Sequence, residues 1–77
     1  MPHPDDLLLQ AARREVGANI RRFRASAALT LEQVGARVGR DRRTISSWEH
    51  GATAPGLDDL TLLARALGVE SWRLLYG

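Results

Sequence analysis

The 77-residue sequence contains no cysteine and no lysine, and its only aromatic residues are two tryptophans, one tyrosine and one phenylalanine. Without cysteine, neither a disulfide nor a thiolate metal site can hold the chain together. No apolar run approaches the roughly 20 residues of a membrane-spanning helix. The opening Met-Pro-His-Pro-Asp-Asp also lacks the basic and apolar regions of a signal peptide. We therefore expect a cytoplasmic protein with no membrane partner.

Motifs for catalysis and for cofactors are also missing. His3 and His50 lie far apart in the sequence and do not have the spacing of metal ligands. The chain contains no glycine-rich phosphate loop and no credible Ser-His-Asp arrangement. We expect no catalytic residues, no metal and no cofactor, and hence a protein that is not an enzyme.

The chain does contain a concentration of positive charge in its middle. Residues 21–50 hold seven arginines against three acids, whereas residues 1–20 and residues 51–77 each hold two arginines against three acids. A basic cluster on a small domain is typical of proteins that bind a polyanion, although a solvated surface shows the same pattern. The exclusive use of arginine suits bidentate pairing with phosphate and guanine, but a GC-rich genome also explains it.

The first part of the chain has the periodicity of a helix. Apolar residues recur every three or four positions between about residues 5 and 27, which predicts one helical face: Leu9, Ala12, Val16, Ile20, Phe23 and Ala27. Gly17 interrupts this pattern and lowers helix propensity by about 1 kcal/mol relative to alanine. The pattern leaves open whether this segment is one long helix or two.

Capping signals predict two short helices in the middle of the chain. Thr30 and Gln33 have the spacing of a capping box, and Gly39 suits the left-handed residue that ends a helix. Asp41 is a good cap for the next helix, which Gly51 ends. The apolar residues expected on the inner faces of these helices are Leu31, Val34, Val38, Ile45 and Trp48.

The last third of the chain predicts two further helices, over about residues 57–67 and residues 69–76. Asp58 and Asp59 suit the first turn of the longer one, because acids favour the positive end of a helix dipole. No segment has a strand pattern. The sequence therefore predicts one all-α domain with short connections.

Residues 29–51, Pro55 and residues 60–69 resemble the phage-repressor (Cro/Xre) helix-turn-helix family of transcriptional regulators. The specific points are the cap at Thr30, Gly39, the Glu49-His50-Gly51 ending and the Ala-Leu-Gly-Val run at residues 66–69. The resemblance implies a five-helix lambda-repressor-like domain over residues 16–77, with residues 1–15 as a helical N-terminal extension. It also implies a homodimer that binds double-stranded DNA at a near-palindromic site and represses transcription.

The resemblance places a recognition helix at residues 41–50, which would enter the DNA major groove. Its base-contacting positions correspond to Asp41, Arg42, Arg43 and Ser47. The chemistry of the two arginines agrees, because a guanidinium group pairs with O6 and N7 of guanine and discriminates by about 1–3 kcal/mol. For Asp41, the sequence leaves open a contact with cytosine or a purely capping role.

The family's phosphate-contacting positions fall at the starts of the second and fourth helices, in the turn and after the recognition helix. Here these positions hold Thr30, Leu31, Arg40, His50, Gly56 and Leu57. Free N–H groups at helix N-termini suit phosphate. Many relatives have a glutamine where this chain has Leu31, which offers only its backbone N–H. They usually have alanine where this chain has Gly35.

Arg24 and Glu49 occupy positions that form a buried ion pair in several relatives. A cationic partner for Glu49 is also expected from electrostatics, since an acid is unfavourable at the negative end of a helix. We expect the pair to fix the recognition helix against the first helix, with spare N–H groups of Arg24 available to phosphate.

Several apolar residues leave a second class of function open. Leu7 and Leu8 lie outside the region of resemblance and either pack on the bundle, extend a dimer interface or project from an arm. Trp72 fits either a dimer contact or the monomer core. These residues suit the alternative that the chain is an antitoxin or adaptor, which acts mainly on a toxin or co-regulator protein.

Overall fold

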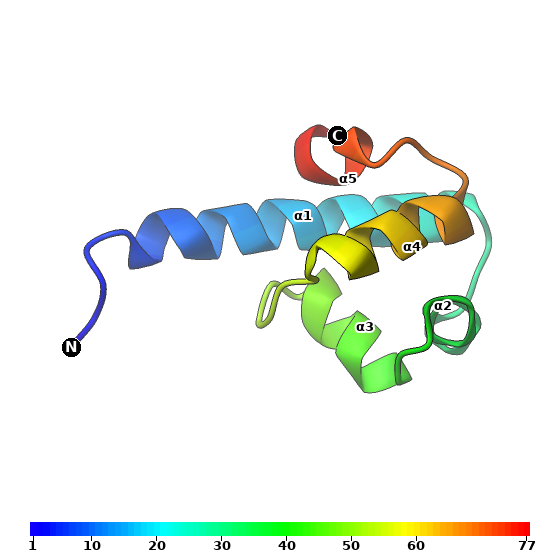
Figure 1. The fold of residues 1–77 in the computed structure, drawn as a ribbon, viewed down its shortest axis with the longest axis horizontal. Helices are drawn as coiled ribbons and strands as arrows, with labels where there is room; N and C mark the ends of the chain where they lie inside the picture. Colours follow the sequence, from blue (N-terminus) through cyan, green and yellow to red (C-terminus); the bar gives the residue numbers. More distant parts are fainter.

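The computed structural model describes residues 1–77, and its regular structure consists of five helices (Figure 1). They are α1 (Asp6–Ser26), α2 (Leu31–Val38), α3 (Arg42–Glu49), α4 (Leu57–Leu67) and α5 (Trp72–Tyr76). The all-α, five-helix architecture is therefore as predicted. None of these helices combines the length and apolarity that crossing a bilayer requires.

The core lies where the long helix α1 meets the four shorter ones. Helix α1 packs against α3 and α5, and α2 packs against α3 and α4. The buried apolar side chains come from all five helices, so each helix is held by its inner face: Ile20, Val34, Val38, Ile45, Trp48, Leu63, Ala64, Leu67 and Leu74. This arrangement leaves the outer face of α3 free.

Helix α1 is a single helix, which decides the question that Gly17 raised. A Cβ atom at Gly17 would lie 2.2 Å from the carbonyl oxygen of Trp48 and 2.7 Å from that of Glu49. The glycine therefore lets α1 touch the end of α3. It lowers helix propensity without breaking the helix, and the close packing requires it.

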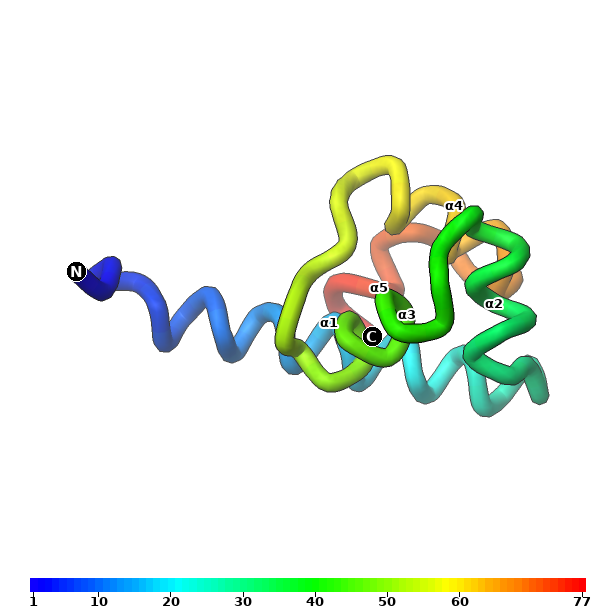
Figure 2. The backbone as a smooth tube through the Cα atoms, turned by 90° about the horizontal axis from the view of Figure 1, so that it is seen from below, coloured from blue at the N-terminus to red at the C-terminus, as the bar shows by residue number.

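The amino-terminal part of α1 extends beyond the body of the domain (Figure 2). Leu7 and Leu8 are 82% and 68% exposed, so they do not pack back on the bundle. The predicted apolar face of this helix is consequently buried only in its middle. Ile20 is fully buried, whereas Leu9, Ala12 and Ala27 are exposed.

The turn between α2 and α3 is tight because two glycines permit it. Gly39 has the left-handed conformation, with φ of +71°, and ends α2 as predicted. A Cβ atom at Gly35 would lie 2.4 Å from the carbonyl oxygen of Arg40. Alanine at this position would therefore force the turn away from α2.

The carboxyl-terminal helix is shorter than predicted. Helix α5 begins at Trp72 rather than near Val69, because Gly68 adopts a left-handed conformation and Val69 packs against the core. The side-chain amide of Asn19 is buried and donates to the carbonyl of Leu74 at 3.0 Å, which attaches α5 to α1. Trp72 is 52% exposed and is not part of the core.

Candidate nucleic-acid interface

Helix α3 presents a polar outer face that its buried inner face supports. Ile45 is fully buried and Trp48 is 4% exposed, while Arg42 and Arg43 are exposed at the start of the helix. The carboxylate of Asp41 accepts a hydrogen bond from the backbone N–H of Arg43 at 2.9 Å. This bond makes Asp41 the N-cap of α3 and favours the capping role that the sequence left open.

The two arginines at the start of α3 differ in their contacts. Arg42 forms an ion pair with Glu32 of α2, with 3.1 Å between Nη1 and Oε1, and both side chains are 59% exposed. An exposed pair of this kind contributes only about 0–1 kcal/mol, so a competing anion can displace Glu32. The side chain of Arg43 has no ion-pair partner within the domain.

A shallow concavity of about 560 Å³ lies beside these arginines. It is lined by Arg42, Arg43, Ser46, Ser47 and Ala52. The hydroxyl of Ser47 is 2.7 Å from the hydroxyl of Thr53 in the loop that follows α3. Sequence reasoning did not single out Thr53, since nothing local indicates that this loop folds back on the helix.

A bidentate ion pair joins α1 to the end of α3. Arg24 donates from Nε and Nη2 to the two carboxylate oxygens of Glu49, at 2.6 and 2.9 Å, and from Nη1 to the carbonyl of Leu29 at 3.0 Å. The side chains are 19% and 4% exposed. The hydrogen bond to Glu49 raises the pKa of Arg24, against an opposing effect of burial. The pair that was expected at these positions is therefore present, and it holds α3 against α1.

Two of the side chains expected to contact phosphate already have partners in the domain. Arg40 donates to both carboxylate oxygens of Asp59 at 3.0 and 3.3 Å, and its side chain is 50% exposed. His50 is exposed, with Nδ1 2.8 Å from the carbonyl oxygen of Ser46. Arg40 keeps further N–H groups, because its Nη1 has no partner, whereas the N–H of His50 that faces Ser46 is already used, since a carbonyl oxygen can only accept from Nδ1.

Free backbone donors lie at the starts of α2 and α4. The hydroxyl of Thr30 accepts from the N–H of Gln33 at 3.1 Å, and the Gln33 side chain accepts from the N–H of Thr30, which completes the predicted capping box. The N–H groups of Leu31 and Leu57 donate to no other group of the domain. Each helix therefore offers unpaired N–H groups together with the positive end of its dipole.

Comparisons with known proteins agree with this geometry. A family model described as a helix-turn-helix domain matches residues 15–72. The chain is 41% identical, over 63 residues and 82% of each sequence, to an uncharacterized HTH-type transcriptional regulator, y4dJ, from Sinorhizobium fredii (strain NBRC 101917 / NGR234). The chain therefore belongs to the helix-turn-helix family of transcriptional regulators, as its resemblance to Cro/Xre proteins implied.

Solved structures of regulators have the same fold. The restriction-modification controller protein C.AhdI from Aeromonas hydrophila superimposes with a TM-score of 0.79 and 28% identity, over 83% of this chain and 97% of that one. The clp gene regulator ClgR from C. glutamicum also gives 0.79, with 26% identity over 84% of both chains. A hypothetical transcription factor from Neisseria, NHTF, gives the same TM-score at 30% identity, over 87% of this chain and 77% of that one.

Proposed function

We propose that this protein regulates transcription by inserting α3 into the major groove of double-stranded DNA and reading base sequence there. The observation that carries the proposal is the position of Arg43, an unpaired and exposed guanidinium group on the first turn of a helix that is fixed from behind. Arg42 joins it when DNA displaces Glu32. Base pairs would be read by these two arginines, with Ser47 in a closer and smaller contact.

Phosphate contacts would come from both sides of α3. The free N–H groups of Leu31 and Leu57 suit phosphate oxygens. Four further groups would contact phosphate once DNA replaces their hydrogen-bond partners within the domain: the N–H of Gly56 and the side chains of Thr30, Arg40 and His50. Most of these donors belong to the first turns of α2 and α4, which are natural anion-binding positions. These contacts would fix how deeply and at what angle α3 sits in the major groove, without distinguishing one base sequence from another.

We further propose that the protein acts as a homodimer and represses transcription. Two copies related by a twofold axis place their recognition helices about 34 Å apart, in successive major grooves on one face of DNA. In this function the protein binds without catalysis, requires no cofactor and works in the cytoplasm, where bacterial-type operators are accessible.

A mobility-shift series on operator variants tests the reading of bases. The operator is first selected from random duplexes with the full chain. We expect Arg43→Ala to lose about 1–3 kcal/mol of discrimination at particular G·C pairs, whereas His50→Ala weakens binding to all sequences alike. The matched control is Arg65→Ala, which replaces an exposed arginine of α4 and should change neither the discrimination between base pairs nor the overall affinity for DNA.

The same series identifies the outcomes that contradict the proposal. Uniform weakening by Arg43→Ala would mean that this side chain contacts phosphate only. If the double variant Arg42→Ala/Arg43→Ala bound DNA as the wild type does, α3 would not be part of the DNA interface.

The exposed aromatic side chains of α5 favour a second candidate function. Trp72 and Tyr76 are 52% and 78% exposed, and aromatic residues are enriched in protein–protein contacts. As an antitoxin or adaptor, the chain would bind a toxin or co-regulator through this face. Stable co-purification of the wild type with such a protein, and its loss in Trp72→Ala, would support this role in addition to DNA binding.

A further inference from the structure

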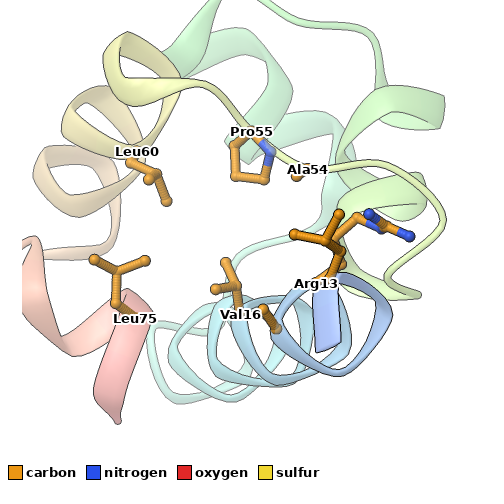
Figure 3. Close-up of a pocket in the computed structure, with 8 residues that line it drawn as sticks. Arg13, Val16, Ala54, Pro55, Leu60 and Leu75 are labelled. Atoms are coloured by element: carbon orange, nitrogen blue, oxygen red, sulfur yellow. The ribbon is translucent and has the colours of Figure 1, made fainter. Parts of the chain in front are cut away.

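The amino-terminal half of α1 lines one side of an apolar groove that is empty in the monomer. The groove has a volume of about 280 Å³. Leu9, Ala12, Arg13 and Val16 of α1 line one side, and Ala54, Pro55, Leu60 and Leu75 line the other (Figure 3). Leu9 is 46% exposed at the outer end of this groove, beside the still more exposed Leu7 and Leu8. A run of exposed leucines beside an apolar groove marks a contact surface.

Charged residues at the two ends of this α1 face have opposite signs. Asp6, Leu9 and Arg13 are spaced at i, i+3 and i+7, so they follow one another along one side of the helix. The carboxylate of Asp6 accepts only the backbone N–H of His3, at 3.0 Å. Arg13 has no ion-pair partner, and its Nε is buried without a hydrogen-bond partner. Neither charge is paired within the domain, and because Nε of Arg13 is buried, another molecule would meet the terminal Nη groups of this half-buried side chain.

When a second copy of this helix runs in the opposite direction, its order of acid, apolar residue and base matches the first, with each acid opposite a base. In two antiparallel α1 helices whose twofold axis passes beside Leu9 and Gln10, Asp6 of each copy faces Arg13 of the other. Parallel helices would instead place like charges opposite each other, which costs free energy.

We propose that a second copy of this chain docks on this face, with residues 6–13 of the two α1 helices packed antiparallel and Leu9 of each copy covering the groove of the other. The contact is isologous, so each Asp6–Arg13 pair occurs twice. This inference rests on the homodimer in the proposed function and names its surface. It explains why α1 extends beyond the domain (Figure 1).

Charge reversal tests the pairing, with sedimentation equilibrium of the full chain in the absence of DNA as the measurement. We expect Asp6→Arg and Arg13→Asp each to weaken self-association about tenfold or more, because each introduces two like-charge contacts. The double variant restores the opposite-sign pairs and should recover most of the affinity. Glu15→Arg is the matched control, since it lies half a turn around α1 from Asp6 and should leave association unchanged.

Each alternative result overturns the proposal. Single variants that associate like the wild type would mean that the dimer uses another surface. Weakened single variants without recovery in the double variant would exclude the antiparallel register. A wild type that stays monomeric would exclude a second copy as the occupant of the groove. Circular dichroism confirms that each variant is folded. Binding of Asp6→Arg to a single half-site separates a failed interface from a failed DNA-binding function.

Discussion

Two glycines on inner surfaces decide how closely neighbouring segments approach. Gly17 lies against the backbone at the end of α3, and Gly35 lies against the turn that leads into it. At both positions the atom that an added methyl group would meet is a carbonyl oxygen of the main chain, which cannot move aside as a flexible side chain can. The orientation of α3 therefore depends on residues that themselves contribute no side-chain contact.

We predict that Gly17→Ala lowers the free energy of unfolding by about 2 kcal/mol. Overpacking costs about 1–3 kcal/mol, and a clash with two main-chain carbonyl oxygens belongs at the upper end of this range. Subtracting the gain of about 1 kcal/mol in helix propensity leaves a net loss of about 2 kcal/mol. Urea denaturation followed by circular dichroism measures the change. The control is Gly56→Ala, whose added methyl group has its nearest neighbour at 3.7 Å and should cost less than about 1 kcal/mol. Equal losses would contradict the steric explanation.

Residue-scale prediction from the sequence succeeded where the signal is local. The capping box at Thr30 and the cap at Asp41 were predictable, because each involves residues two or three positions apart. The role of Gly17 was not predictable, since its effect depends on a carbonyl more than thirty positions away in the sequence. The same limit applies to the pairing of Arg40 with Asp59, which joins the turn to α4.

At the scale of elements, α3 is held at its carboxyl end by a charged contact with α1. The bidentate pair of Arg24 and Glu49 is largely removed from solvent, so losing one partner leaves an uncompensated charge. The sequence predicted this pair through family resemblance and the helix dipole, but the additional bond from Arg24 to Leu29 became evident only in the structure. All three guanidinium nitrogens of Arg24 donate within the domain, which favours positioning of α3 over phosphate contact.

We predict that Arg24→Met and Glu49→Leu each lower the free energy of unfolding by about 3 kcal/mol, and that the double variant loses less than the sum. The reason is that the second substitution removes the charge left unpaired by the first. Because the pKa of Arg24 is raised on folding, this stabilisation is present at lower pH and is lost only as pH rises through that raised value. Thermal unfolding at neutral pH therefore measures the intact pair. Additive losses would show that the two side chains are not coupled.

At the scale of the whole molecule, charge and shape are segregated. The excess of arginine falls in residues 21–50, which include α2 and α3, whereas the flanking segments carry a slight excess of acid. The molecule is elongated, with extents of 38 × 23 × 20 Å, because α1 projects from one side. The segregation of charge was evident in the sequence. The projection of α1 was not, because periodicity locates a helical face without showing how much of it the domain covers.

We predict that DNA affinity falls steeply with salt. A dimer that neutralises about six to ten phosphates loses about 10³–10⁵ in affinity between about 50 and 200 mM salt. Arg40→Ala should make the plot of log K against log salt shallower by about one unit per copy if this side chain contacts phosphate. Fluorescence anisotropy of a labelled operator measures the slopes. An unchanged slope would mean that Arg40 serves only to bind Asp59.

The two tryptophans occupy contrasting environments, one in the core beneath α3 and the other half exposed on α5. Their intrinsic emission therefore carries two signals that a small quencher can separate. Acrylamide reaches Trp72 readily, and Trp48 becomes accessible only when the packing behind α3 opens. A change confined to the quenchable fraction reports contacts made by α5, whereas a change in the protected fraction reports loosening of α3, without any added dye or engineered label.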